Sequence, residues 1–301
     1  MSDKALKRLL EVAAGLSERA ADETGFVALA ALAREVQADV KFRPLLVEGI
    51  AAQPKSKDGR WLILIDNETH RVSEDMLAQE SAARPLGSRV RNTVAHELAH
   101  ALGPRYEEAV GKSDRSREEI VAVLEKETEQ LSPALLIPRR AMEALLKARR
   151  EPFDIAELVA ARDRWGVSDR VFVKRFELIM QEGDSPLRHN ARLENIIIGA
   201  GEWLGVDRVE LLPMPFKGHR GLIPEFASLL RNRRKISAEE YFPSPDFYLN
   251  GGSDSSTTTQ VWLGTAGSPQ SERTEIEISV EAVPRRAGEQ FLWIARNVKA
   301  V

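Results

Sequence analysis

Apolar residues recur at three- and four-residue steps along much of the first 180 residues, which is the spacing of one face of an α-helix. At the start of the chain this spacing is carried by Leu6, Leu9, Ala13 and Leu16. Pro133 is expected to end one helix, and Ser168 is expected to cap the beginning of another. The pattern predicts helices over residues 3–38, from residue 88 onward, and over 116–131, 139–150, 154–164 and 168–180.

Short aliphatic or alternating runs predict β-strands in two parts of the chain. Residues 40–51 and 60–66 flank the turn-like segment PKSKDG, and they predict a hairpin. After a linker-like GDSP at 183–186, we expect a helix near 189–204. The runs TTTQVWLG, RTEIEISVEAV and EQFLWIARNV follow, and they predict a mostly antiparallel sheet with helices on one side.

The composition favours a globular protein of two or three domains. The 301 residues are 43% hydrophobic and 30% charged, with a net charge of −3, which suffices for a core and a soluble surface. Cysteine is absent, which excludes disulfides and thiolate metal sites. No apolar run approaches the roughly 20 residues of a membrane span, and charges interrupt the beginning of the chain where a secretory signal would be apolar. We therefore expect a cytoplasmic protein with no membrane partner.

Residues 91–100 read RNTVAHELAH and contain the chemically most specific motif of the chain. His96 and His100 are four residues apart, so one helix face presents both imidazoles. Val94 and Leu98 fall largely on another face and can anchor the helix in a core. A helix with two solvated or packed histidines is one interpretation, and a zinc site of the H-E-x-x-H type is the other.

A catalytic zinc site requires a third protein ligand and leaves one position open for water. The other three histidines lie in a predicted loop, in the linker and in the distant C-terminal region, so we expect a carboxylate. The helix after the motif contains Glu125, Glu127 and Glu129. A charged helix face is most often simply solvated, and spacing alone does not choose among the three.

The segment RVRNTVAHELAHAL, together with EKETEQLSPALLIP at 125–138, resembles the ImmA/IrrE family of zinc peptidases. That family pairs an R-F-T-x-A-H-E-x-x-H helix with a second helix reading E-x-x-A-N-x-F-A-x-x-L-L-M-P. Matching Pro138 to the family proline places the family's glutamate ligand on Glu125. The chain departs from the pattern at Asn92, Ala99, Thr128 and Leu131–Ser132, and at Glu129, whose position in the family normally orients a ligand histidine.

The resemblance implies a role for each motif residue. His96, His100 and Glu125 would hold Zn²⁺, which lowers the pKa of its bound water to roughly 7. Glu97 would be the general base that takes the water proton and passes it to the leaving amine. An oxyanion stabiliser is also needed, and three residues remain candidates for it, namely Tyr106, His70 and His189.

The resemblance also implies a fold class and a domain order. We expect an α+β protein with a mainly helical, zincin-like peptidase domain and a small β-sheet over 1–138. A helix-turn-helix-like segment would follow over 139–184, and a C-terminal α+β sensor-like domain of the GAF kind over 185–301. Arg170, Lys174 and Arg175 are available to contact DNA from the middle segment, but that segment equally fits a helical hairpin that completes the peptidase fold.

The predicted function is zinc-dependent cleavage of a helix-turn-helix transcriptional repressor. Cleavage would derepress stress, DNA-damage or phage-defence genes when the C-terminal domain senses a signal. Tryptophans and a basic cluster in that domain suggest single-stranded DNA as the activator, although such clusters are usually solvated and a small-molecule signal is the rival. The residues concerned are Arg231, Arg233, Arg234 and Lys235, with Trp203, Trp262 and Trp293.

Two other functions remain open. One is a DNA-binding transcriptional regulator with a structural or lapsed zinc site, and the other is a zinc hydrolase that acts on a small amide. Retention of Glu97 argues against the first, because a purely structural zinc site has no use for a base beside its ligand.

Overall fold

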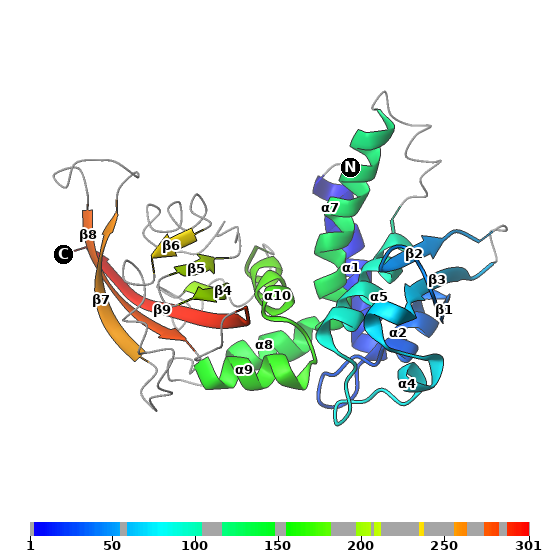
Figure 1. The fold of residues 1–301 in the computed structure, drawn as a ribbon, viewed down its shortest axis with the longest axis horizontal. Coiled ribbons are helices and arrows are strands. Elements are labelled where there is room, and N and C mark those ends of the chain that lie inside the picture. The colour runs from blue at the N-terminus through cyan, green and yellow to red at the C-terminus, as the bar shows by residue number, and fades with distance from the viewer. Residues whose placement is uncertain are drawn as a thin grey trace. The chain divides into compact units, whose positions relative to one another are not determined.

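A computed structural model of the chain describes residues 3–54, 59–103, 116–147, 155–181, 197–205, 208–211, 235–237, 256–263, 274–282 and 288–300 (Figure 1). The chain forms two compact units, Met1–Leu145 with Arg162–Arg175, and Leu146–Ala161 with Phe176–Val301. The domain boundaries expected from the sequence remain predictions. Among the described helices, none has both the length and the apolar character that crossing a bilayer requires.

The chain begins with two helices, α1 (Asp3–Ala20) and α2 (Leu29–Val36), rather than the single helical stretch predicted for this region. The Asp22 carboxylate accepts hydrogen bonds from the Thr24 backbone N–H at 2.8 Å and from the Thr24 hydroxyl at 2.7 Å. Gly25 follows at φ +80°, in the left-handed region that glycine adopts without strain. This turn ends the first helix, so the prediction of continuous helix was wrong here.

A three-stranded sheet follows in the order β1-β3-β2, built from β1 (Ala38–Arg43), β2 (Gly49–Ala52) and β3 (Trp61–Asp66). β2 and β3 are antiparallel, as predicted for a hairpin. β1 runs parallel to β3, so the first predicted run is two strands rather than one. Pro44 directly follows β1 and lacks the N–H that continued pairing would need.

Helix α5 (Ser88–His100) lies at the centre of the first unit (Figure 1). It contacts β2, β3 and α2, and it also packs on α7 (Arg117–Leu136), which in turn contacts α1. α7 continues through Pro133, contrary to the predicted stop. The missing N–H of Pro133 removes one helical hydrogen bond, and the helical pattern continues beyond it, since the Ile137 N–H donates to the Pro133 carbonyl at 3.1 Å. Two short helices, α3 (Asn67–His70) and α4 (Glu74–Ala78), complete the region before α5.

The middle of the chain forms α8 (Arg139–Lys147), α9 (Ile155–Arg164) and α10 (Asp169–Gln181). The turn between α9 and α10 was predicted correctly, since Gly166 has φ +59° and the Ser168 hydroxyl accepts the Val171 N–H at 3.4 Å.

One cation that was expected to be available to DNA is buried. Arg175 is fully buried, and its Nε donates to the carbonyl of Ile137 at 2.9 Å. This side chain therefore braces the end of α7 and cannot contact DNA, which favours the helical-hairpin interpretation. Arg170, in contrast, is exposed.

The second unit contains a six-stranded sheet whose neighbouring strands are all antiparallel, in the order β6-β5-β4-β9-β8-β7. The three alternating runs form β7, β8 and β9 as predicted. The helix predicted near 189–204 was wrong from residue 197 onward, because Ile198 and Ala200 are both buried at a spacing of two within β4. The strands are β4 (Ile197–Gly205), β5 (Arg208–Leu211), β6 (Lys235–Ser237), β7 (Ser256–Leu263), β8 (Thr274–Ala282) and β9 (Gln290–Ala300).

The protein is therefore α+β, as the sequence predicts. The first unit is mainly helical with one small sheet. Residues 189–196 of the predicted covering helix lie outside the described residues.

A buried ion pair fixes the beginning of α5. Arg91 has no exposed surface, and its Nη1 donates to the Glu80 carboxylate. Its Nη2 donates to the carbonyl of Val27 at 2.9 Å, and the guanidinium lies 4.3 Å from the centre of the Phe26 ring. The other Glu80 oxygen accepts the backbone N–H of Leu29 at 2.7 Å. α5 is thus tied to the first turn of α2.

Replacement of Arg91 by Met should lower the free energy of unfolding by about 3–5 kcal/mol, because it leaves the Glu80 carboxylate buried without its cation. Urea denaturation measures this change. Arg19→Met is the matched control, since Arg19 pairs with Glu35 at the surface and should cost at most about 1 kcal/mol. Equal losses in the two variants would contradict the structural role assigned to Arg91.

Candidate metal centre

Helix α5 presents two imidazoles on one face. His96 and His100 lie one helical turn apart, and their rings meet edge to face with centroids 5.0 Å apart. Val94 and Leu98 are completely buried on the side of the helix that packs into the core. The packing therefore sets the rotation of α5 and points both histidines toward α7.

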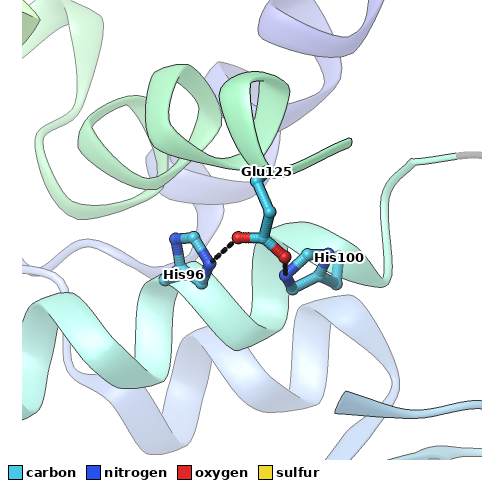
Figure 2. A group of neighbouring side chains, drawn as sticks. All are labelled: His96, His100 and Glu125. Carbon is cyan, nitrogen blue, oxygen red and sulfur yellow. Dashed lines mark hydrogen bonds and ion pairs between the residues drawn. The ribbon is translucent and has the colours of Figure 1, made fainter. Parts of the chain in front are cut away.

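Helix α7 supplies the third side chain, as Figure 2 shows. One oxygen of the Glu125 carboxylate lies 3.0 Å from His96 Nε2, and the other lies 3.3 Å from His100 Nε2. One ligand atom from each of the three residues lies within 4.8 Å of the others. The structure thus brings together the three residues that the sequence nominated as metal ligands.

The donor set fits zinc. Two imidazoles and one carboxylate, with a fourth position open, form one of the ligand sets of catalytic zinc sites. Ligand atoms about 2.0–2.1 Å from a tetrahedral ion are about 3.3 Å apart, close to the observed 3.0 and 3.3 Å between nitrogen and oxygen. Burial lowers the pKa of His100, which favours the neutral imidazole that a metal requires.

A cavity of about 460 Å³ opens beside the three side chains. Residues of α5, α7 and β2 line most of it, together with Gln53, Trp61 of β3 and Gly103. β2 lies at the edge of the three-stranded sheet. The candidate ligands therefore face a space that a substrate can enter.

Glu97 lies in the wall of this cavity and is only 8% exposed. Burial raises the pKa of its carboxyl group to about 7, and the negative charge of Glu125 adds to this effect. The backbone N–H of Ala51 acts in the opposite direction, because it hydrogen-bonds the ionised form. A pKa near neutrality suits a group that accepts and returns a proton.

Thr128 is a second residue of α7 that contacts His96. Its hydroxyl donates to the Glu125 carbonyl at 2.8 Å and lies 3.4 Å from His96 Nε2. Glu129, which the resemblance nominated for orienting a histidine, is exposed and does not line the cavity. Glu127, in contrast, is buried and lines it. The three-residue step from Glu125 to Thr128 on a helix could have identified the threonine from sequence.

Of the three candidates for an oxyanion stabiliser, His70 is the one that lies within the described residues. The His70 side chain is 2% exposed, and its Nε2 lies 3.7 Å from Glu48. His70 is not among the residues that line the cavity, so the structure gives no support for it as an oxyanion stabiliser. Tyr106 and His189 lie outside the described residues.

Comparison with known families gives the same interpretation for part of the chain. Residues 88–177 match the Peptidase_M78 family, described as IrrE N-terminal-like domain. This segment is IrrE-like. The match begins at the first residue of α5 and ends within α10, so the IrrE-like segment contains the motif helix, α7 and the middle helices. It confirms the resemblance to the ImmA/IrrE family and indicates a metallopeptidase-like protein.

Comparison with solved structures identifies a Mycobacterium tuberculosis transcriptional regulator, with 11% sequence identity and a TM-score of 0.40. The alignment covers 96% of this chain and 76% of that one. A likeness at this level carries no argument about fold or function. No curated protein matches the chain.

The purified protein should contain about one zinc per chain, and two matched substitutions on α7 test the ligand assignment. Glu125→Ala should weaken zinc binding by more than the roughly 10–100-fold that loss of an outer contact costs. Glu129→Ala should leave it unchanged, because Glu129 is exposed and outside the cavity. Elemental analysis and competition with a chelator measure both effects. Equal zinc loss in the two variants would show that Glu125 is not a ligand.

Proposed function

We propose that the protein is a zinc-dependent endopeptidase that cleaves a helix-turn-helix transcriptional repressor. The observation that carries the proposal is the placement of Glu97 in the wall of the same cavity that His96, His100 and Glu125 border. These four side chains combine three metal-binding groups with one separate proton acceptor. The IrrE-like segment that contains them supports the assignment.

Bound zinc would supply a Lewis acid and a water activated at neutral pH. His96, His100 and Glu125 would hold the ion, and Thr128 would restrain His96 from the side. Glu97 would take a proton from the attacking water and return it to the leaving amine. Its raised pKa favours this exchange, because a group that titrates near neutral pH both accepts and releases protons readily.

The cavity favours a peptide over a small amide as substrate. Strand β2 forms one of its walls and lies at the edge of its sheet. The part of this edge that Glu97 does not occupy can pair with an extended peptide through backbone hydrogen bonds. A small amide lacks the extended backbone that such pairing requires.

The repressor as substrate, and a role in stress, DNA-damage or phage-defence responses in the cytoplasm, rest on the family resemblance. A DNA-binding regulator with a structural or lapsed zinc site is the alternative. The near-neutral pKa of Glu97 argues against that alternative, and so does the burial of Arg175, which removes one of the three cations expected to reach DNA.

The proposal also gives the C-terminal region a regulatory role, with single-stranded DNA as its signal. Trp203, Trp262 and Trp293 lie on β4, β7 and β9 of one sheet, and bases stack on such side chains. Lys235 begins β6, whereas Arg231, Arg233 and Arg234 lie outside the described residues. A regulatory domain of the GAF kind would bind a small molecule instead.

Glu97→Gln should abolish cleavage while the zinc content is kept. A general base contributes typically 10²–10⁴-fold, and the amide occupies the same volume without accepting the proton. New protein N-termini should therefore appear in cells that express the wild-type protein and be absent with Glu97→Gln, with one of them inside a helix-turn-helix repressor. Identical sets of N-termini in the two strains would reject the peptidase.

Short single-stranded DNA should bind the full chain with an affinity that falls steeply as salt rises, since counterion release drives such binding. Charge reversal at Arg233 and Arg234 should weaken binding and leave the zinc content unchanged. Fluorescence anisotropy of a labelled oligonucleotide measures the affinity. Absent or salt-insensitive binding would reject DNA as the signal and leave the peptidase assignment standing.

A further inference from the structure

The outer edge of strand β2 faces the helix that carries Glu97. The Glu48 carbonyl accepts the Asp66 N–H at 3.0 Å across the β2–β3 ladder. Because backbone groups alternate in direction along an antiparallel pair, Gly49 and Ala51 turn their N–H and C=O groups away from β3. α5 contacts β2, and the Ala51 N–H hydrogen-bonds the Glu97 carboxylate.

Gly49 leaves a space that the Glu97 side chain fills. A Cβ atom at position 49 would lie 2.8 Å from Glu97 Cγ and 2.9 Å from its Oε1, closer than van der Waals contact allows. The backbone of Gly49 does not have the positive φ that would itself demand glycine. The requirement for glycine at this position is therefore steric, and it comes from Glu97.

We propose that the edge of β2 at Gly49 and Ala51 is the positioning element for Glu97, holding its carboxylate against the strand in the cavity wall. This inference rests on the proposed function, which makes Glu97 the general base. A carboxylate held by a backbone N–H on one side cannot swing freely into the position of a fourth ligand. Gly49 and Ala51 act through Glu97 and are positioning residues.

The arrangement predicts how Gly49→Ala behaves. The atoms that an added methyl group meets are Cγ, Cδ and Oε1 of the Glu97 side chain, which lies in the cavity wall, and none of them is a backbone atom. The side chain should therefore move and the fold should persist. The displaced carboxylate leaves the Ala51 N–H, while His96, His100 and Glu125 keep their places.

The Ala51 amide resonance in the full, zinc-loaded protein tests this prediction. A hydrogen bond to a carboxylate is charge-assisted and short, so the wild-type amide proton should resonate downfield. Glu97→Ala should remove that downfield shift, and Gly49→Ala should remove it as well. Gly15→Ala is the matched control, since it makes the same change on α1, where the nearest atom is Arg19 Nη1 at 3.7 Å. It should leave the resonance unchanged.

Zinc content and melting temperature measured on the same samples complete the experiment. Both should equal wild type in Gly49→Ala, which separates movement of Glu97 from damage to the fold or the ligands. The proposal would be overturned if the Ala51 amide proton kept its downfield shift in Glu97→Ala. It would also be overturned if that shift persisted in Gly49→Ala. The wild-type protein could also bind no zinc and still show the downfield Ala51 resonance, with its loss in Glu97→Ala and Gly49→Ala. That result would reject the peptidase and leave the positioning contact established.

Discussion

The Glu125 carboxylate lies between two imidazoles that belong to a different helix, and the site depends on keeping α5 and α7 in register. Glu125 lies 3.0 and 3.3 Å from the two imidazole nitrogens. A shift of α7 along its axis by one residue, about 1.5 Å, would separate these groups. Apolar packing alone tolerates such shifts more readily than directed contacts do. The polar contacts that fix α5 and α7 therefore help to maintain the geometry of the candidate metal centre.

Each helix has such a contact. Arg91 ties the beginning of α5 to α2 through Glu80 and the carbonyl of Val27. At the other end of the unit, Arg175 donates to the carbonyl of Ile137, the residue that ends α7. α10 therefore holds the end of α7 through this contact, and the family match, which extends through residue 177, includes it. The resemblance of the middle helices to a helix-turn-helix does not require them to contact DNA.

Two carboxylates share the cavity and take different positions in it. Glu125 is exposed and faces both histidines, whereas Glu97 is buried against β2 and has its pKa raised to about 7. Burial and the neighbouring negative charge both act on Glu97. These two environments match the roles proposed for the two carboxylates, a metal ligand for Glu125 and a proton acceptor for Glu97.

Local patterns in the sequence predicted which three side chains the fold brings together. The H-E-x-x-H spacing places two histidines on one helix face for geometric reasons, and the proline-anchored second motif selected Glu125 from three nearby glutamates. Tertiary facts were not predictable in this way. The burial of Arg175 depends on a carbonyl 38 residues away, and β4 was mistaken for a helix because its apolar run is short and carries no clear period. The dependence of Glu97 on Gly49 likewise joins two elements that are distant in sequence.

X-ray absorption at the zinc edge tests the central claim most directly. The account predicts a first shell of nitrogen and oxygen atoms at about 2.0–2.1 Å and outer-shell scattering from two imidazole rings. The spectrum should be unchanged in Glu97→Gln and should show scattering from one imidazole ring in His100→Ala. A protein that binds no zinc, or a zinc whose imidazole scattering is the same in His100→Ala as in wild type, would contradict it.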